Sequence, residues 1–314
     1  MKIGLLGDNH LTNYSPIRRK DDYFQTHLGK LCQAFQIFRD HECTAVIQPG
    51  DFFDTPTVAN RVKIAIIKLL QTEWFNYKPY ALKPFVVYGQ HDISGHSATT
   101  LPNSPLAVLE AAELITLLGP APVMLNEDKG QQINLYGAPF GEEPPDVENT
   151  ESFNILVTHR MIGDRPLWPG QVLEGPRNFL RKFPDYDLVV CGDYHFRFTE
   201  ICNNRTIINP GAIIRKTIGK FDLELKPAVI IFDTETNNFE IIELKVGTID
   251  DVFDLRRDIK MEEDGVLQFI ERLQKSQGSQ VAWKEVLETV LLEKKTSQSV
   301  KDIIDHVLEE VTND

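Results

Sequence analysis

The 314-residue sequence has few cysteines, no long apolar run and no surplus of basic charge. Its four cysteines are Cys32, Cys43, Cys191 and Cys202, and none of them forms a CxxC pair. This pattern speaks against a cysteine-based structural zinc site. We expect buried free thiols in a reducing compartment, which predicts a cytoplasmic protein.

Long apolar segments are also missing. No run approaches the ~18–20 residues of a membrane helix, and the apolar stretch within MKIGLLGDNH at the N-terminus is too short for a signal peptide. We expect no membrane association, and we expect these first residues to form a strand.

The charge balance is acidic, with 33 Lys+Arg against 46 Asp+Glu and a net charge of −13. Such a balance argues against holding nucleic acid by bulk electrostatics. Most of the acidity lies in residues 221–314, where 11 basic residues face 22 acidic ones. Residues 1–220 carry 22 against 24, so this near-neutral part of the chain can still meet a polyanion.

Short apolar runs alternate with helical patterns through residue 245, which predicts an α/β (α+β) protein built from a two-sheet β-sandwich flanked by helices. Residues 234–238 (TETNN) read as a hairpin turn. The expected strands are 3–6, 45–48, 85–88, 133–136, 155–158, 188–191, 206–208, 229–232 and 241–244, and the expected helices are 28–38, 58–70 and 105–118.

The sequence predicts a catalytic domain over 1–245, a small capping segment over 246–275, a flexible linker at 276–280 and amphipathic helices over 281–314. The apolar stripes of the last segment need a surface to cover them. They pack either on their own domain or on a partner helix, and the sequence leaves both open.

Polar residues gather where five of the expected strands end. The stretches are GDNH (7–10), GDFFD (50–54), GQHD (89–92), THR (158–160) and GDYH (192–195). A lone Asp-x-His means little, and Asp-x-x-Asp after a glycine is usually a turn or a helix cap. Four of the eight histidines fall at these ends, however, namely His10, His91, His159 and His195.

The other four histidines have different contexts. His27, His41 and His306 lie in polar helical stretches and are expected at the surface, and His96 lies in a loop. The clustering of the first four with carboxylates therefore predicts a metal centre. Aspartate and histidine together suit Mn²⁺, Fe²⁺ or Zn²⁺, and two ions ~3.5–4 Å apart suit phosphoryl chemistry.

The five motifs, in this order, resemble those of the calcineurin-like metallophosphoesterases. Within that superfamily the sequence is most similar to the SbcD nuclease family of bacteria and phages. Residues 38–56 (FRDHECTAVIQPGDFFDTP) and 208–216 (INPGAIIRK) support this resemblance, which covers about residues 1–245.

The resemblance implies that Asp8, His10, Asp51 and His195 surround a first metal ion. Asp51 bridges to a second ion, whose other ligands fall at Gln90, His159 and Asp193.

The same resemblance implies roles for residues beside the ions. Asp51, His91 and Asp92 are the expected catalytic residues: His91 touches the substrate, and Asp92, like Asp54, orients its neighbours. Arg160 either clamps a phosphate or balances the charge of the site.

Two further residues, Asn9 and Arg215, are expected to bind substrate.

The chain departs from the family pattern at the second ion. Gln90 replaces the usual asparagine, and Asp193 replaces the usual histidine. A third carboxylate beside Asp8 and Asp51 favours Mn²⁺ or Mg²⁺ at this position. Either the second ion is retained with these ligands, or the site has decayed.

Three functions follow from these patterns. The first is an Mn²⁺-dependent DNA exonuclease and endonuclease in DNA repair or recombination, a homodimer that acts with an SbcC-like coiled-coil ABC ATPase. The second is a phosphatase or small-molecule phosphodiesterase with the same centre. The third is a degenerate scaffold, which the intact first site argues against.

Overall fold

The computed structural model describes residues 1–75, 83–128, 131–167 and 171–254. Contacts divide the chain into two compact units, and the described residues belong to the first, 1–167 with 171–255. Among them no helix combines the length and the apolar composition needed to cross a membrane.

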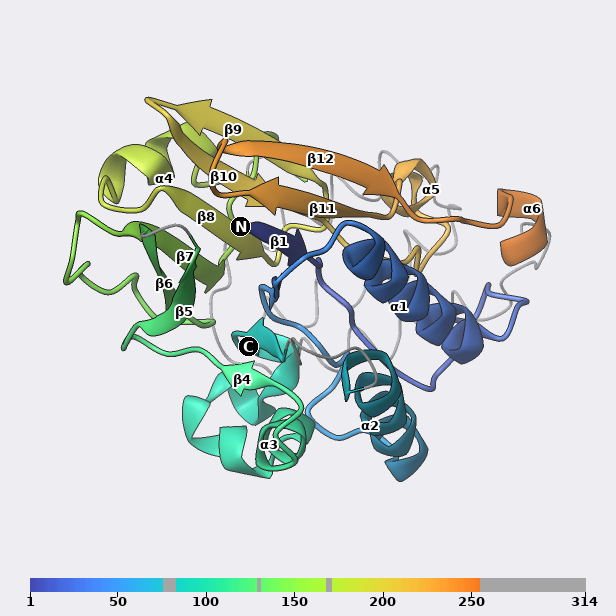
Figure 1. Ribbon diagram of the computed structural model, residues 1–314. Coiled ribbons are helices and arrows are strands. Elements are labelled where there is room, and N and C mark those ends of the chain that lie inside the picture. Colours follow the sequence, from blue (N-terminus) through green and yellow to red (C-terminus); the bar gives the residue numbers. More distant parts are fainter. Residues whose placement is uncertain (76–82, 129–130, 168–170, 255–314) are drawn as a thin grey trace, which may run out of the picture. The chain divides into compact units, whose positions relative to one another are not determined.

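Two mixed sheets of six strands form the centre of this unit, in the orders β12-β11-β1-β2-β3-β4 and β5-β6-β7-β8-β10-β9 (Figure 1). In the first sheet β1 to β4 are parallel, and in the second β6, β7, β8 and β10 are parallel. The strands are β1 Lys2–Leu5, β2 Ala45–Gln48, β3 Pro84–Val86, β4 Thr116–Leu117, β5 Val123–Asp128, β6 Gln131–Ala138, β7 Phe153–His159, β8 Leu188–Gly192, β9 Phe198–Cys202, β10 Arg205–Asn209, β11 Ala228–Asp233 and β12 Asn238–Glu243.

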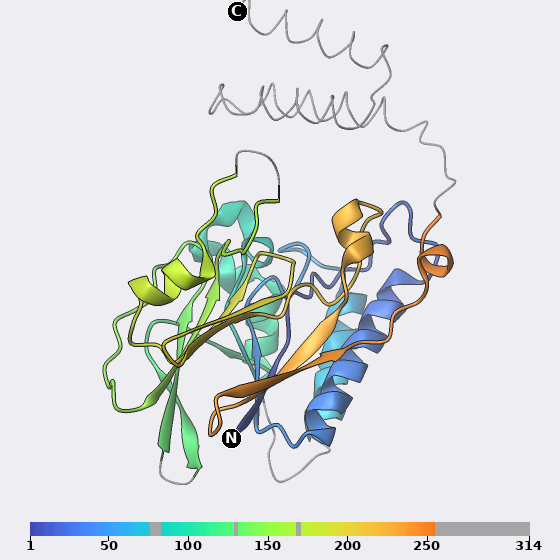
Figure 2. The same ribbon diagram turned by 90° about the horizontal axis from the view of Figure 1, so that it is seen from above.

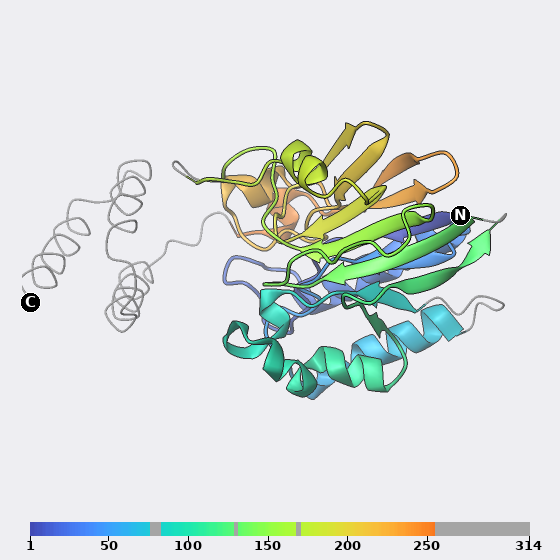
Figure 3. The same cartoon turned by 90° about the vertical axis from the view of Figure 1, so that its left-hand side faces the viewer.

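Helices cover the outer faces of both sheets, as Figures 2 and 3 show. The apolar cluster under α1, α2 and α3 includes strand residues of the first sheet, and the cluster under α4 includes those of the second. The helices are α1 Tyr23–Asp40, α2 Asn60–Phe75, α3 Pro105–Ala111, α4 Pro176–Lys182, α5 Lys220–Glu224 and α6 Ile249–Val252, with 3₁₀ turns η1 Gln90–Asp92, η2 Ser94–His96 and η3 Ala98–Asn103.

The two sheets bury a shared apolar core between them. Leu5 and Ile47 of the first sheet belong to the same cluster as Val157 and Val190 of the second, and all four are fully buried. Successive side chains of a strand point to opposite faces of its sheet. Because both faces are buried here, the strands appear in the sequence as continuous apolar runs. The predicted sandwich flanked by helices is confirmed.

Parallel strands send their carboxyl ends to one edge of a sheet, where open α/β proteins place their ligands. Strands β1, β2 and β3 end in the first three polar motifs, and β7 and β8 end in the other two. The fold therefore brings the five motifs to corresponding edges of the two packed sheets.

The predicted helix 105–118 is wrong in its second half. Helix α3 ends at Ala111, and Thr116–Leu117 form strand β4. Glu113 adopts φ +57, while the amides of Glu113 and Leu114 donate to the carbonyls of Glu110 and Leu109. These bonds close the helix by a Schellman motif, which the apolar spacing alone does not reveal.

Helix α1 corrects the expected surface position of His27. This residue is fully buried and stacks edge-on against Tyr23, with 5.8 Å between the ring centroids. Residues 23, 27, 31, 34 and 38 share the helix face that packs inward, and the polar neighbours in the sequence hide this register. His41 is partly exposed, and His306 lies outside the described residues.

None of the four cysteines, all of which lie within the described residues, forms a disulfide, as predicted, but two of them are not buried. Cys32 is exposed on α1, and Cys202 is partly exposed on the edge strand β9. Only Cys43 and Cys191 match the expected burial. The predicted linker 276–280, the segment 281–314 and most of 246–275 lie outside the described residues.

Candidate metal centre

Acidic and imidazole side chains from the five strand ends converge on one small region. Their metal-binding atoms form three overlapping groups, in each of which these atoms lie within 4.8 Å of one another. The groups are Asp8 with His10 and His195, His10 with Asp51 and His91, and Asp8 with Asp51 and His159.

Asp51 lies at the middle of these groups and is fully buried. Its Oδ2 is 3.3 Å from Nε2 of His159, 3.6 Å from Nε2 of His10 and 4.0 Å from Nε2 of His91. Its Oδ1 accepts the backbone N–H of His91 at 2.9 Å. One carboxylate oxygen is thus fixed by the backbone, and the other faces three imidazoles.

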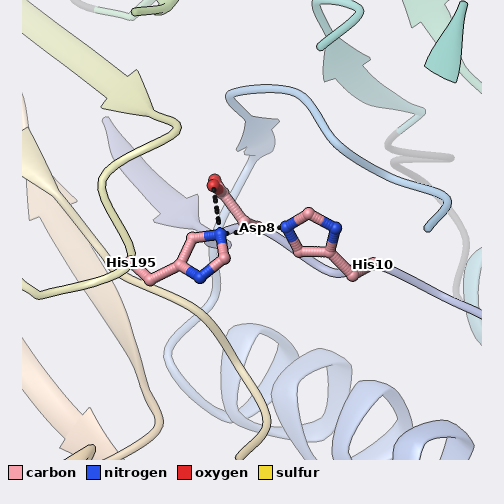
Figure 4. A group of neighbouring side chains, drawn as sticks. All are labelled: Asp8, His10 and His195. Carbon is pink, nitrogen blue, oxygen red and sulfur yellow. Dashed lines mark hydrogen bonds and ion pairs between the residues drawn. The ribbon is translucent and has the colours of Figure 1, made fainter. Parts of the chain in front are cut away.

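A second carboxylate completes one end of the cluster (Figure 4). Asp8 Oδ2 accepts the backbone N–H of Asp193 at 2.8 Å and lies 3.8 Å from Nε2 of His195. The Nε2 atoms of His10 and His195 are 3.0 Å apart. Two imidazole nitrogens that face each other and a carboxylate are the donor set that a divalent ion prefers.

Gln90 and Asp193, the two positions at which the sequence differs from the motifs that it resembles, contact each other. The side-chain amide of Gln90 donates to Oδ1 of Asp193 at 2.7 Å. This bond leaves Oε1 of Gln90 buried and without a hydrogen-bond partner. Asp193 thus holds the amide in the orientation that leaves its carbonyl oxygen free to bind an ion.

Several buried atoms of the cluster lack any hydrogen-bond partner. A buried polar atom without a partner costs about 1–3 kcal/mol, and such atoms are rare in folded proteins. Because these atoms are lone-pair donors gathered in one place, the residues fit divalent metal ions. They are Asp8 Oδ1, Asp51 Oδ2, Gln90 Oε1 and His159 Nε2.

Backbone carbonyls orient the imidazoles. His159 Nδ1 lies 2.7 Å from the carbonyl of Pro49, and His91 Nδ1 lies 2.9 Å from the carbonyl of Asp54. A ring that donates its Nδ1–H to a carbonyl presents the lone pair of Nε2. In both residues this Nε2 is the atom that faces Asp51.

Two pKa values in the cluster are raised, which indicates that its carboxylates require nearby positive charge. Burial raises the pKa of Asp8 to about 8, against the opposing effect of His159. Burial lowers the pKa of His159, but the Asp51 carboxylate outweighs it and brings this pKa to about 10. Protons here supply the charge that metal ions would supply in their place.

Asp92 is buried and accepts three backbone N–H groups rather than facing the cluster. Its donors are Phe52 at 3.2 Å, Phe53 at 2.9 Å and Gly89 at 2.9 Å. Since these amides belong to the loops after β2 and β3, Asp92 fixes the segment that carries Asp51. This is an orienting contact.

Lys216 was not singled out from the sequence, yet it contacts the centre. Its ammonium donates to Oδ1 of Asp54, an oxygen that also lies 3.4 Å from Nδ1 of His10. Burial would raise the pKa of Asp54, but hydrogen bonds from His10 and Lys216 lower it to about 2. No local pattern marks Lys216, because it lies 162 residues from Asp54.

Gln48 is a second residue that the sequence reasoning missed. Its side-chain amide donates to the carbonyls of Gly50 and Gly7, and its Oε1 accepts the N–H of Gly50 at 3.2 Å. It thereby joins the loops after β1 and β2. The available signal was a polar side chain at the end of the buried strand Ala45–Gln48.

Close approach explains two of the glycines that precede the motifs. A Cβ on Gly192 would lie 2.6 Å from Oδ1 of Asp8, and one on Gly89 would overlap the Asp51 carboxylate. These glycines make room for ligand side chains from neighbouring loops.

Backbone strain also gathers at the centre. His10, Asp51 and Asp193 have φ values of +47, +50 and +80. Non-glycine residues rarely adopt this conformation, which persists where surrounding contacts enforce it, often at functional sites.

The three expected substrate-binding residues lie in different surroundings. Asn9 is fully buried, and both polar atoms of its side chain lack a partner. Arg160 pairs with Glu143 at 3.0 Å and Glu174 at 3.1 Å. Arg215 donates Nε to the carbonyl of Leu225 at 2.9 Å and lines a separate hollow.

Comparison by sequence finds no matching protein-family model and no matching curated protein. Comparison by structure finds similar folds. An archaeal phosphodiesterase matches with a TM-score of 0.41 and 19% identity, over 78% of this chain and 100% of the other. A putative 5′-nucleotidase from Staphylococcus aureus matches with a TM-score of 0.47 and 15% identity, over 87% of this chain and 58% of the other. A dimetal phosphatase from Danio rerio matches with a TM-score of 0.44 and 12% identity, over 77% of this chain and 96% of the other. This similarity concerns the fold alone, and the chemistry follows from the side chains of the centre.

Divalent metal should stabilise the folded protein. At a hundredfold excess over its Kd, an ion adds about 2.7 kcal/mol, which corresponds to a rise of about 5–10 °C in Tm for a domain of this size. We expect this rise with Mn²⁺ relative to EDTA in differential scanning calorimetry. The Asp51→Asn variant should lose it, and equal Tm values of the wild type in Mn²⁺ and EDTA would contradict a metal centre.

Proposed function

We propose that this chain is a metal-dependent phosphodiesterase of the metallophosphoesterase type and that its substrate is DNA. The observation that carries the first part is the convergence of unpartnered donor atoms from Asp8, Asp51, Gln90 and His159. The order of the five motifs, which resembles that of the SbcD nucleases, supports the second part.

We propose two divalent ions for this centre, and the oxygen-rich donor set favours Mn²⁺. Asp8, His10, Asp51 and His195 would hold the first, and Asp51, Gln90, His159 and Asp193 would hold the second. When bound, such ions polarise a phosphoryl group and activate water for attack on phosphorus.

We assign His91 the role of acting on the substrate. Two of the four imidazoles are well exposed, His91 at 43% and His195 at 45%, whereas His10 and His159 are 6% and 0% exposed. Because Nε2 of His195 faces Nε2 of His10 at 3.0 Å, we assign His195 to the first ion and His91 to the substrate. The carbonyl of Asp54 holds its Nδ1, so Nε2 is the atom available to a phosphodiester. We assign it proton donation to the departing sugar oxygen, a step that requires the imidazolium form, in which Nδ1–H bonds to the carbonyl of Asp54 and Nε2 carries the proton that is transferred.

The charge of the chain is compatible with DNA as substrate, although it does not favour it. Residues 151–220 carry 10 basic residues against 7 acidic ones. Three of the proposed metal ligands lie within this stretch, namely His159, Asp193 and His195. The acidic surplus lies after residue 220. An SbcC-like coiled-coil ATPase partner would supply further DNA-binding charge.

A nuclease assay tests the substrate. Purified protein with Mn²⁺ should degrade linear duplex and single-stranded DNA, and His91→Ala should lower kcat by about 10²–10⁴, the usual contribution of a general acid. A generic phosphodiester reporter is assayed in parallel. Turnover of the reporter without DNA cleavage would favour a small-molecule phosphodiesterase or phosphatase, and no turnover with any metal by folded protein would favour a scaffold.

Metal analysis tests the second ion. We expect two ions per chain in the wild type and one in Asp193→Ala, measured by plasma mass spectrometry after dialysis. Asp193→Asn separates two roles, because its side-chain oxygen can still accept the amide of Gln90. Two ions in this variant would assign Asp193 an orienting role, one ion would assign it direct ligation, and an unchanged ratio in Asp193→Ala would remove it from the centre.

The proposed partner is an ATPase that binds residues 281–314, which lie outside the described residues, and the proposed assembly is a homodimer in the cytoplasm. Deletion of 281–314 should abolish co-purification of the ATPase and leave hydrolysis of the reporter unchanged, since the centre lies wholly within residues 8–195 and Lys216. Retained co-purification would refute this docking role.

A further inference from the structure

A hollow of about 240 Å³ lies apart from the metal centre, and its lining includes four basic residues. None of the proposed metal ligands lines it, and within the described residues its lining includes no acidic residue. The lining consists of Arg19, Thr26, Gly29, Lys30, Gln33, Arg215, Lys245, Val246, Gly247 and Val252.

Arg19 lines the hollow, and its positive charge is balanced by the carboxylate of Asp21. Its guanidinium makes two bonds to Asp21, at 2.8 and 2.7 Å, and a third to the carbonyl of Arg215 at 2.6 Å. It also lies 4.9 Å from the ring of Tyr23 and 5.1 Å from that of Phe253. The remaining positive charge of the hollow therefore comes from its other basic residues.

Lys30 provides the most deeply buried of these charges. It is 6% exposed, and its Nζ donates to the carbonyl of Lys245 at 3.0 Å. Burial lowers its pKa to about 8, the charges of Arg19 and Arg215 act in the same direction, and the carboxylate of Asp21 acts less strongly in the opposite one. The ammonium is thus still mostly protonated at neutral pH, although no carboxylate of the described residues forms an ion pair with it. A buried charge in this state is costly unless an anion compensates it.

Gly29 keeps the hollow open. It lies within the 18-residue helix α1, where glycine costs about 0.5–1 kcal/mol relative to alanine. A Cβ at this position would meet no atom within 4 Å, so packing does not require glycine. A larger side chain would project into the space beside Lys30.

We propose that this hollow is an anion site that binds inorganic phosphate or the phosphate group of a small phosphomonoester. Lys30, Arg215 and Lys245 supply three positive charges, which match a dianion better than a carboxylate, and a guanidinium and ammonium groups suit phosphate oxygens. The volume lies below the ~300–1,000 Å³ of sites for drug-sized ligands, so the anion is small.

Lys216, which donates to Asp54 at the metal centre, directly follows Arg215 in the chain. The test must therefore separate phosphate binding in the hollow from effects on the metal centre. Inorganic phosphate is titrated into the full-length, metal-free protein by isothermal titration calorimetry. Gly29→Glu places a carboxylate at the hollow, and Gly29→Gln is its neutral control of equal size. Lys30→Met removes the buried charge, and Asp51→Asn changes the metal centre without changing any residue that lines the hollow.

We expect one phosphate site per chain in the wild type and in Asp51→Asn. Gly29→Glu should bind phosphate at least about tenfold more weakly than Gly29→Gln, because its carboxylate would repel the anion. Lys30→Met should show a similar loss, as expected when a charge-assisted bond is removed. No binding by the wild type, equal affinity in the two Gly29 variants, or loss only in Asp51→Asn would overturn the proposal. Binding of a short DNA duplex is measured in the same way. The proposal would also be overturned if Gly29→Glu weakened binding of the duplex but left binding of phosphate unchanged.

Discussion

A buried carboxylate surrounded by imidazoles is the constraint on which the rest of this structure depends. Asp51 is fully buried, with one oxygen fixed by the amide of His91 and the other facing His159, His10 and His91. Its charge cannot be solvated by water, so it must be met by cations or protons. The neighbouring loops are built to hold it in that position.

Those loops are joined by side chains that never reach the cluster. Asp92 collects three amides from the loops after β2 and β3, and Gln48 joins the loops after β1 and β2. Each contact converts a flexible loop into a fixed position, which is what preorganised metal ligands require. Strained φ values at His10 and Asp51 persist because these contacts enforce them.

The Gln90–Asp193 bond gives a shared physical meaning to the two positions at which the sequence differs from the metallophosphoesterase motifs that it resembles. Separately, a longer amide and an added carboxylate each look like the loss of a ligand. Together they form a 2.7 Å hydrogen bond that aims the carbonyl oxygen of Gln90. The pair presents an oxygen donor to the centre, which is consistent with a preference for hard divalent ions.

The sequence by itself predicted the sandwich and the five polar strand ends, because both follow from local patterns, whereas the assignment of single residues to two ions came from the resemblance. An apolar run that ends in glycine and then Asp or His, as at Gly192 and Asp193, marks a strand end whatever the rest of the chain does. Tertiary structure decided what lies beyond those ends. It buried His27 on the inner face of α1, paired Arg160 with two glutamates and directed Arg215 into a separate hollow. These outcomes depend on contacts between residues far apart in the chain, such as Lys216 with Asp54, and no periodicity in the sequence records which side chain will meet which.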